Sequence, residues 1–361
     1  MEFNQDLEGE RSPINNPLLL GHDDAEQLFL SSFFSKRVPH AWLLTGTKGI
    51  GKATFAYRVA RFVLTNNAIS SETDELFSSD LEMDKPPINL NSDINNPICR
   101  RIMSGGHPDF LNITRTLDEK TGKIKKQITV DEIRKINSFL SLTSAEGGWR
   151  VIVIDSLDDL NLNSANALLK ILEEPPANTL ILLVCHNLMS ILETIKSRCR
   201  HIKLKLLEKD ILITLIKKYL IELPMDETEI LTRLSGGSIG RALYLADGPT
   251  LEVFNQIETI LATFPKIDMS KVHELGNTLQ RDKTGDLFIH AMHFLANWVA
   301  NNIKNLATSD LEKSQPWLDI WDRIVDSVNK LKALNLDQKQ VFLNTFVSIK
   351  TLTNNSNSGL G

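Results

Sequence analysis

A glycine-rich segment that ends in a lysine is the first part of the chain whose residue types could bind a ligand. It fits the pattern G-x-x-x-x-G-K and consists of Gly46, Thr47, Lys48, Gly49, Ile50, Gly51 and Lys52. In such a loop the glycines let backbone N–H groups surround phosphate oxygens, and the lysine adds a positive charge. The segment therefore predicts a phosphate cradle. The alternative is an ordinary glycine turn between a strand and a helix.

The two residues after the loop bear on metal binding. The pattern normally ends in Ser or Thr, whose hydroxyl holds the magnesium ion that bridges the phosphates. This chain has Ala53 there, and Thr54 follows. A step of one residue along a helix turns a side chain by about 100°, so we expect Thr54 to face away from the metal. The cradle is therefore predicted to lack one metal ligand.

A carboxylate with a neighbouring hydroxyl forms the second candidate group. Asp155 ends the apolar run VIVID, the place where P-loop NTPases carry a second metal-binding carboxylate. Its alternative role is to cap the turn that follows. The next residue is Ser156, and a serine hydroxyl is a poor base for activating water. The pattern favours nucleotide binding over efficient turnover.

Strands and helices must alternate around these residues if they are to meet at one edge of a parallel sheet. Apolar runs predict buried strands at 40–45, 151–155 and 179–185. Helical spacing of apolar residues predicts helices over 24–35, 52–64, 130–142 and 164–174. From about residue 206 onward only amphipathic helical stretches recur. The alternation indicates an α/β fold with a parallel sheet, followed by a helical region.

The bulk composition limits the class of protein. A chain of 361 residues is longer than a single hydrophobic core usually accommodates, so we expect two or three domains. With a net charge of −5, any contact with nucleic acid must rest on a local surface or on partner subunits. The cysteines, Cys99, Cys185 and Cys199, form no CxxC pair, which disfavours disulfides and a four-thiolate zinc site and fits a reducing cytosol. We expect no signal peptide, and no stretch approaches the ~20 apolar residues that span a bilayer.

Two motifs resemble a known family. The segment SANALLKILEEPP at 164–176 resembles the signature of bacterial clamp-loader subunits, and Ser197-Arg198-Cys199 resembles their SRC motif. Together with GTKGIGK, GGHPDFLNITR and ITVDEIRKI, they make residues 39–243 similar to the delta-prime family of DNA polymerase III subunits. The resemblance implies an AAA+ P-loop domain with a parallel sheet, a small helical lid and an all-helical C-terminal collar domain.

The resemblance also implies domain bounds. Residues 1–205 are expected to form the AAA+ P-loop (RecA-like) domain, with a polar insert near 66–97. Residues 206–250 are expected to form the lid, residues 251–354 the collar or oligomerisation domain, and residues 355–361 a polar tail. Members of the family often carry a four-cysteine zinc module after the first helix of the P-loop domain. Residues 65–106 contain Cys99 alone, so no zinc is expected.

The resemblance assigns a role to Arg198. It implies an arginine finger that acts in trans on the ATP site of an adjacent subunit, whereas the residues alone also allow a surface arginine paired with a local carboxylate. On the SANALLKILEEPP helix, Lys170, Glu173 and Glu174 are expected to be free for a neighbouring subunit, or else to form a solvated face.

Three positions depart from the motor subunits of the family. AAA+ ATPases typically have a glutamate where this chain has Ser156, and their polar sensor falls here on Cys185 or His186. Gly240 stands where the second sensor arginine belongs, and Arg241 is one place off. These departures imply little or no intrinsic ATPase activity.

The expected function is therefore that of a non-motor, stator-like subunit of the DNA polymerase III clamp loader, a cytoplasmic complex within a DNA-directed DNA polymerase holoenzyme. The implied partners are the motor and clamp-opener subunits and the sliding clamp, with primed DNA bound through the complex and no membrane. ATP or ADP could be held without efficient turnover. The alternative is an autonomous ATPase, either a motor subunit or another P-loop NTPase.

Overall fold

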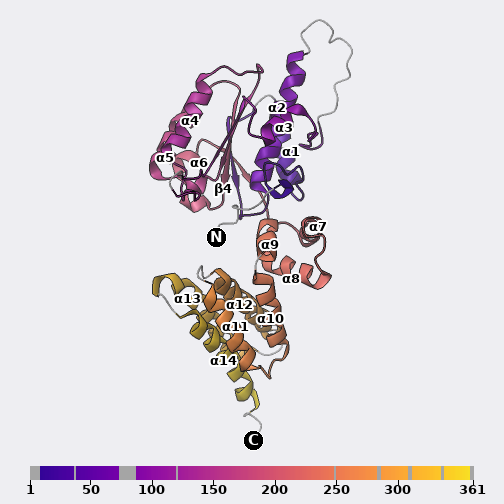
Figure 1. Ribbon diagram of the computed structural model, residues 1–361, viewed down its shortest axis with the longest axis vertical. Coiled ribbons are helices and arrows are strands. Elements are labelled where there is room, and N and C mark those ends of the chain that lie inside the picture. The colour runs from indigo at the N-terminus through magenta and orange to yellow at the C-terminus, as the bar shows by residue number, and fades with distance from the viewer. Residues whose placement is uncertain are drawn as a thin grey trace. The chain divides into compact units, whose positions relative to one another are not determined.

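The computed structural model describes residues 9–35, 38–72, 87–118, 121–247, 249–282, 286–307, 311–334 and 337–357. By contacts, the described chain separates into two compact units. The sheet unit contains Phe3–Glu222 and Gly236–Arg241, and the helical unit contains Leu223–Ser235 and Ala242–Gly361. Each unit is described by itself (Figure 1).

The sheet unit is built on five parallel strands. They are β1 (Ala41–Thr45), β2 (Phe110–Thr114), β3 (Arg150–Asp155), β4 (Thr179–Cys185) and β5 (Arg200–Lys203), and they lie in the order β2-β3-β4-β1-β5. The register aligns Thr45 with Cys185, and Asp155 with Val184. The carboxyl ends of β1, β3 and β4 therefore meet at one edge of the sheet, where ligands bind in open α/β folds. The strand at 151–155 and the strand at 179–185 are confirmed.

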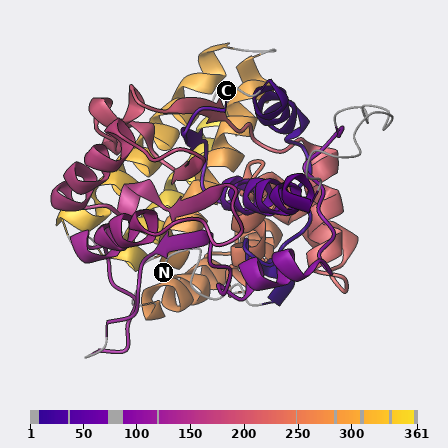
Figure 2. The same cartoon turned by 90° about the horizontal axis from the view of Figure 1, so that it is seen from above.

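Helices cover both faces of the sheet (Figures 1 and 2). One face carries α1 (Asp23–Phe34), α2 (Lys52–Glu72) and α3 (Pro97–Met103), and the other carries α4 (Val130–Ser141), α5 (Leu162–Glu173) and α6 (Glu193–Lys196). Successive strand side chains point to opposite faces, so Leu43 and Leu183 join one core while Leu44 and Leu182 join the other. Buried apolar residues on both faces explain the unbroken apolar runs of the strands.

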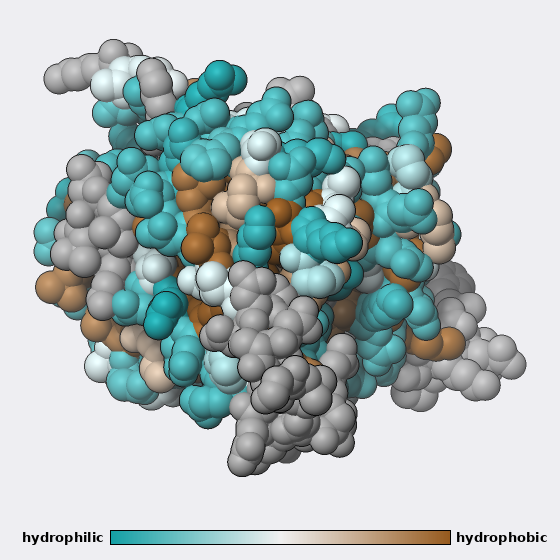
Figure 3. All heavy atoms as spheres, turned by 90° about the horizontal axis from the view of Figure 1, so that it is seen from below, coloured by the Kyte–Doolittle hydropathy of each residue, from teal (hydrophilic) through white to brown (hydrophobic). Residues whose placement is uncertain are grey.

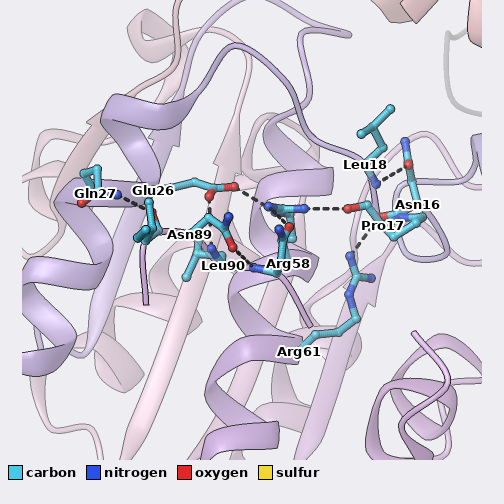
Figure 4. Close-up of polar contacts among 11 residues, drawn as sticks. Asn16, Pro17, Leu18, Glu26, Gln27, Arg58, Arg61, Asn89 and Leu90 are labelled. Atoms are coloured by element: carbon cyan, nitrogen blue, oxygen red, sulfur yellow. Dashed lines mark hydrogen bonds and ion pairs between the residues drawn. The ribbon is translucent and has the colours of Figure 1, made fainter. Parts of the chain in front are cut away.

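Helix α2 begins at Lys52, the last residue of the glycine-rich loop, and buried arginines tie it to the N-terminal part of the chain (Figure 4). The Arg58 guanidinium donates to Glu26 Oε1 of α1 at 2.9 Å and to the carbonyl oxygen of Pro17 at 2.6 Å. Arg61 donates to the carbonyl oxygen of Asn16 at 2.9 Å. These bonds satisfy charges that would otherwise be costly to bury.

The segment predicted as a polar insert near 66–97 is partly helical. Helix α2 continues to Glu72 instead of ending near 64, because residues 65–72 contain no Gly or Pro and can prolong an established helix. Residues 87–96 carry no helix or strand, and the rest of the predicted insert lies outside the described residues. Short 3-10 helices are found at Gly9–Arg11, Leu157–Asp159 and Leu188–Ser190.

The chain after β5 is helical throughout its described residues, as predicted. Its helices are α7 (Lys209–Tyr219), α8 (Met225–Ser235), α9 (Ile239–Ala246), α10 (Thr250–Ala262), α11 (Met269–Arg281), α12 (Asp286–Ala307), α13 (Leu311–Leu334) and α14 (Gln338–Asn357). In the helical unit, the rings of Phe264, Trp298 and Trp317 meet with centroids 5.6–5.8 Å apart. The face drawn in Figure 3 is mainly hydrophilic, with apolar residues in limited areas. The helices thus bury their apolar faces against one another.

Candidate functional site

The glycine-rich loop lies between β1 and α2, as the sequence predicted. Gly46, Gly49 and Gly51 have φ values of 141°, 80° and 109°, a region of backbone conformation that side chains with a Cβ rarely adopt. Gly46 has a second reason to be glycine, since a Cβ there would lie 2.7 Å from the carbonyl oxygen of Leu204. These backbone conformations are ones that a phosphate cradle requires and that glycine allows.

Lys52 is directed back into this loop. Its Nζ donates to the carbonyl oxygens of Gly46 at 2.6 Å and of Thr47 at 2.7 Å, and the residue is only 3% exposed. Burial lowers the pKa of the ammonium group to about 8, and the carboxylate of Asp155 partly opposes this shift. The lysine thus holds a positive charge inside the loop, where a phosphate group would compensate it.

Asp155 is the second charged group at this edge of the sheet. Its Oδ1 is buried and has no hydrogen-bond partner among the described residues. Burial raises the pKa of Asp155 to about 6, against the lowering effect of Lys52. A buried carboxylate oxygen without a partner suits a cation. However, no group of three or more His, Cys, Asp or Glu side chains in the described ranges is placed to hold a metal ion.

Ala53 and Ser156 stand where the sequence pattern would place a magnesium ligand and the residue that activates water. Ala53 is half-buried and has no oxygen, and the buried Thr54 belongs to α2 with 7% exposure. The hydroxyl of Ser156 donates to Asp159 Oδ2 at 3.1 Å. Neither Ala53 nor Ser156 therefore offers a group to hold a magnesium ion or to activate an attacking water.

Asp158 joins the turn after β3 to the turn after β4, and the sequence analysis did not single it out. Its carboxylate accepts from the backbone N–H groups of His186 at 2.6 Å and of Asn187 at 2.7 Å. The Nδ1 atom of His186 is buried without a partner among the described residues, and burial lowers the pKa of this imidazole. Asp158 and His186 are 28 residues apart, so no local pattern could have indicated the bond.

The start of α9 and the residue before it are bonded directly to the glycine-rich loop. The Gly240 N–H donates to the carbonyl oxygen of Gly49 at 2.8 Å, and the Ser238 hydroxyl donates to the carbonyl oxygen of Lys48 at 2.8 Å. A Cβ at position 240 would lie 2.8 Å from the Cα of Gly49. Position 240, where the family resemblance places a sensor arginine, is therefore a close backbone contact with no room for a side chain. Arg241 keeps its Nε buried and without a partner among the described residues.

Arg198 lies between α6 and β5 in the chain and forms an ion pair with a local carboxylate, as the residues alone allowed. Its Nη2 donates to Glu173 Oε1 at 2.8 Å, and its Nη1 donates to the carbonyl oxygen of Thr194 at 2.9 Å. The expectation that Glu173 is free for a neighbour is therefore wrong, because the last residue of α5 lies within reach of the residues that follow α6. Lys170 and Glu174 are exposed.

The strand order, the glycine-rich loop between β1 and α2, and the carboxylate at the end of β3 define a class: the chain is a P-loop protein with an AAA+ fold. A family model described as "DNA polymerase III, delta subunit" matches residues 21–208, more than half of the chain. The chain belongs to this family.

Individual relatives are replication proteins. The chain is 30% identical over 200 residues to DNA polymerase III subunit delta' of Pseudomonas aeruginosa, covering 55% of this chain and 53% of that protein. It is 30% identical over 227 residues to the Escherichia coli subunit delta', covering 62% and 59%. It is 29% identical over 233 residues to subunit gamma of Buchnera aphidicola subsp. Schizaphis graminum, covering 63% and 56%. The matches span little more than half the length of these relatives.

Among solved structures, a DNA polymerase III gamma subunit-related protein of Thermotoga maritima is 17% identical, with a TM-score of 0.43 and coverage of 90% of this chain and 99% of that one. None of the helices in the described ranges combines the length and apolar character that crossing a bilayer requires.

Proposed function

We propose that the chain is a stator-like, non-motor subunit of the DNA polymerase III clamp loader, which donates Arg198 to a neighbouring ATP site and helps to load the sliding clamp onto primed DNA. In this proposal residues 206–250 act as a lid and residues 251–354 as a collar that joins the motor and clamp-opener subunits in the cytoplasm. Membership of the family supports this assignment.

The observation that carries the non-motor role is the backbone contact of Gly240 with Gly49. A motor subunit needs a side chain at the sensor position to read the terminal phosphate, and here a Cβ at position 240 would lie too close to the Gly49 backbone, at 2.8 Å from its Cα. Ala53 and Ser156 add to this, since neither supplies the ligand that hydrolysis requires. The cradle is therefore proposed to bind ATP or ADP, if it binds a nucleotide, without efficient turnover.

The residues that would hold such a nucleotide are those of the loop. The backbone N–H groups of residues 47–52 and the ammonium group of Lys52 would bind the phosphates. A bound nucleotide would supply negative charge that raises the pKa of Lys52 toward its ordinary value. We expect no zinc site in this subunit.

The test is a reconstituted clamp loader made with the motor, clamp-opener and clamp proteins of the same organism. Loss of an arginine finger slows hydrolysis at the affected site by about three to five orders of magnitude. Arg198→Ala should therefore lower DNA-stimulated ATPase activity and clamp loading. The matched control is Arg200→Ala, which removes an exposed arginine two positions away. Unchanged activity and loading with Arg198→Ala would refute the proposed role.

The second candidate is an autonomous ATPase, favoured by the intact cradle and by Asp155 at the end of β3. Steady-state ATP turnover by the isolated chain, abolished by Lys52→Ala, would establish this function and exclude the stator role. A nucleotide that is bound but never hydrolysed would instead raise the unfolding temperature without turnover.

A further inference from the structure

The two motifs that carry the family resemblance meet at one ion pair. Glu173 belongs to SANALLKILEEPP and Arg198 to SRC, 25 residues later in the chain. Arg198 Nη2 contacts Glu173 Oε1, and the carbonyl oxygen of Thr194 accepts a hydrogen bond from Arg198 Nη1. The guanidinium group is thus held at two of its nitrogens. These partners lie on separate elements, since Glu173 ends α5 and Thr194 is in α6.

Both partners of the guanidinium group, Glu173 and Thr194, lie on helices that pack in the core of the sheet unit. Helix α5 buries Leu168 and Leu172 against the sheet, and α6 buries Ile195 in the same core. The two helices are in contact with each other, and both lie on the face of the sheet opposite α2 (Figure 1). The distance between these two partners is therefore set by core packing, which is close to incompressible, rather than by surface side chains.

We propose that Glu173 is a positioning residue that fixes the orientation of the Arg198 guanidinium for its action on a neighbouring subunit. This inference rests on the proposed function of Arg198. The Arg198 side chain is still 35% exposed and its Nε–H has no partner among the described residues, so an edge of the group remains open to an incoming phosphate. A planar guanidinium that is already oriented loses less conformational freedom when it makes further hydrogen bonds.

The opposite effect is conceivable in principle, because the negative charge of Glu173 works against stabilisation of an anionic transition state. The geometry favours positioning, since Glu173 contacts Nη2 and leaves the Nε–H without a partner among the described residues. Glu173 is also 50% exposed, so water weakens its longer-range field. The orienting contact at 2.8 Å is retained at short range. Orientation should therefore outweigh repulsion.

The expected effect is small and has a definite size. Exposed ion pairs contribute at most about 1 kcal/mol, which corresponds to about a fivefold change in rate. Glu173→Ala in the reconstituted clamp loader should therefore lower kcat of the DNA-stimulated ATPase by about two- to fivefold, with KM for ATP unchanged. Glu173→Gln keeps an acceptor for the guanidinium and should lose less. In an Arg198→Ala background, Glu173→Ala should have no further effect.

A matched control removes a carboxylate from a nearby ion pair that does not include Arg198. Glu193 pairs with Lys196 on α6 at 2.9 Å, and Glu193→Ala should leave kcat unchanged. A second measurement uses the isolated chain and does not depend on activity. The Nη hydrogens of Arg198 should give separate NMR signals in the wild-type protein and merge in Glu173→Ala, while the unfolding temperature stays the same.

Four results would overturn the inference. A rise in kcat with Glu173→Ala would show that the carboxylate restrains Arg198. Equal kcat, together with unchanged Nη signals, would show that Glu173 does not orient the group. If Arg198→Ala lowers the ATPase and Glu173→Ala does not, only the positioning role fails. If Arg198→Ala itself has no effect, the proposed function fails and the inference falls with it.

Discussion

Replacing Gly240 by alanine tests whether its contact with Gly49 holds the start of α9 against the glycine-rich loop. Gly240 is in α9 and needs no unusual φ angle, so alanine is allowed by the local backbone. Its methyl group, however, would lie 2.8 Å from the Cα and 3.2 Å from the carbonyl oxygen of Gly49. Both are backbone atoms that cannot rotate away. The two segments must separate, and the bond from the Gly240 N–H to the Gly49 carbonyl oxygen weakens.

The magnitude follows from three contributions. Overpacking of a close contact costs about 1–3 kcal/mol, and a weakened hydrogen bond about 1 kcal/mol more. Alanine gains back about 1 kcal/mol over glycine in a helix. The net loss is about 1–3 kcal/mol, which is about a 5- to 150-fold increase in opening of this contact. Gly240→Arg has the same Cβ and should not restore a sensor arginine.

Hydrogen exchange of the amide at position 240 measures this opening directly, together with exchange in the loop at 46–51. The control is Gly276→Ala in α11, where the Cβ would lie 3.2 Å from the flexible Lys339 side chain and at an ordinary contact distance of 3.9 Å from Phe342. That variant should be neutral or more stable by about 0.5–1 kcal/mol. Two outcomes would show that the contact does not hold the start of α9 to the glycine-rich loop. One is unchanged hydrogen exchange of the loop in Gly240→Ala, and the other is stabilisation of the protein by Gly240→Ala as by Gly276→Ala.

Two further changes test the charges around α2. Arg58→Met leaves the 6%-exposed Glu26 side chain buried without its arginine partner and should lower the free energy of unfolding by about 3–5 kcal/mol in urea titrations. Adding Glu26→Gln should recover much of this free energy, and no recovery would contradict the pairing. Because the pKa of Lys52 falls from 10.5 to about 8 on folding, the wild-type free energy of unfolding should rise between these pH values, where only the unfolded chain keeps the proton. Lys52→Met should lack this rise, and an identical pH profile in both proteins would refute the shift.

Much of the sheet unit follows from short patterns. The runs at 151–155 and 179–185 are apolar because both faces of the sheet are covered, and that pattern is visible in a single sequence. The glycines of the loop are also local, since their positive φ angles exclude most side chains. The end of α2 was less predictable, because residues 65–72 are mostly polar yet contain no Gly or Pro.

The partners of the candidate site residues could not be predicted in the same way. The Ser238 bond to Lys48 spans 190 residues, and the Asp158 bond to His186 spans 28. A serine or an aspartate has no sequence signal that says which distant backbone group it will meet. The sequence likewise indicated that Gly240 replaces a sensor arginine, without showing that the glycine is required by its distance from Gly49.

The sequence by itself determined the α/β class, the phosphate loop, the missing ligands at Ala53 and Ser156, and the family resemblance, because each depends on residue types within one short segment. Only the tertiary structure decided that Lys52 bonds to its own loop, that Gly240 packs on Gly49, and that Glu173 holds Arg198. These contacts depend on how separate elements pack across the sheet, and the free energy of that packing is shared among many buried residues rather than encoded at one position.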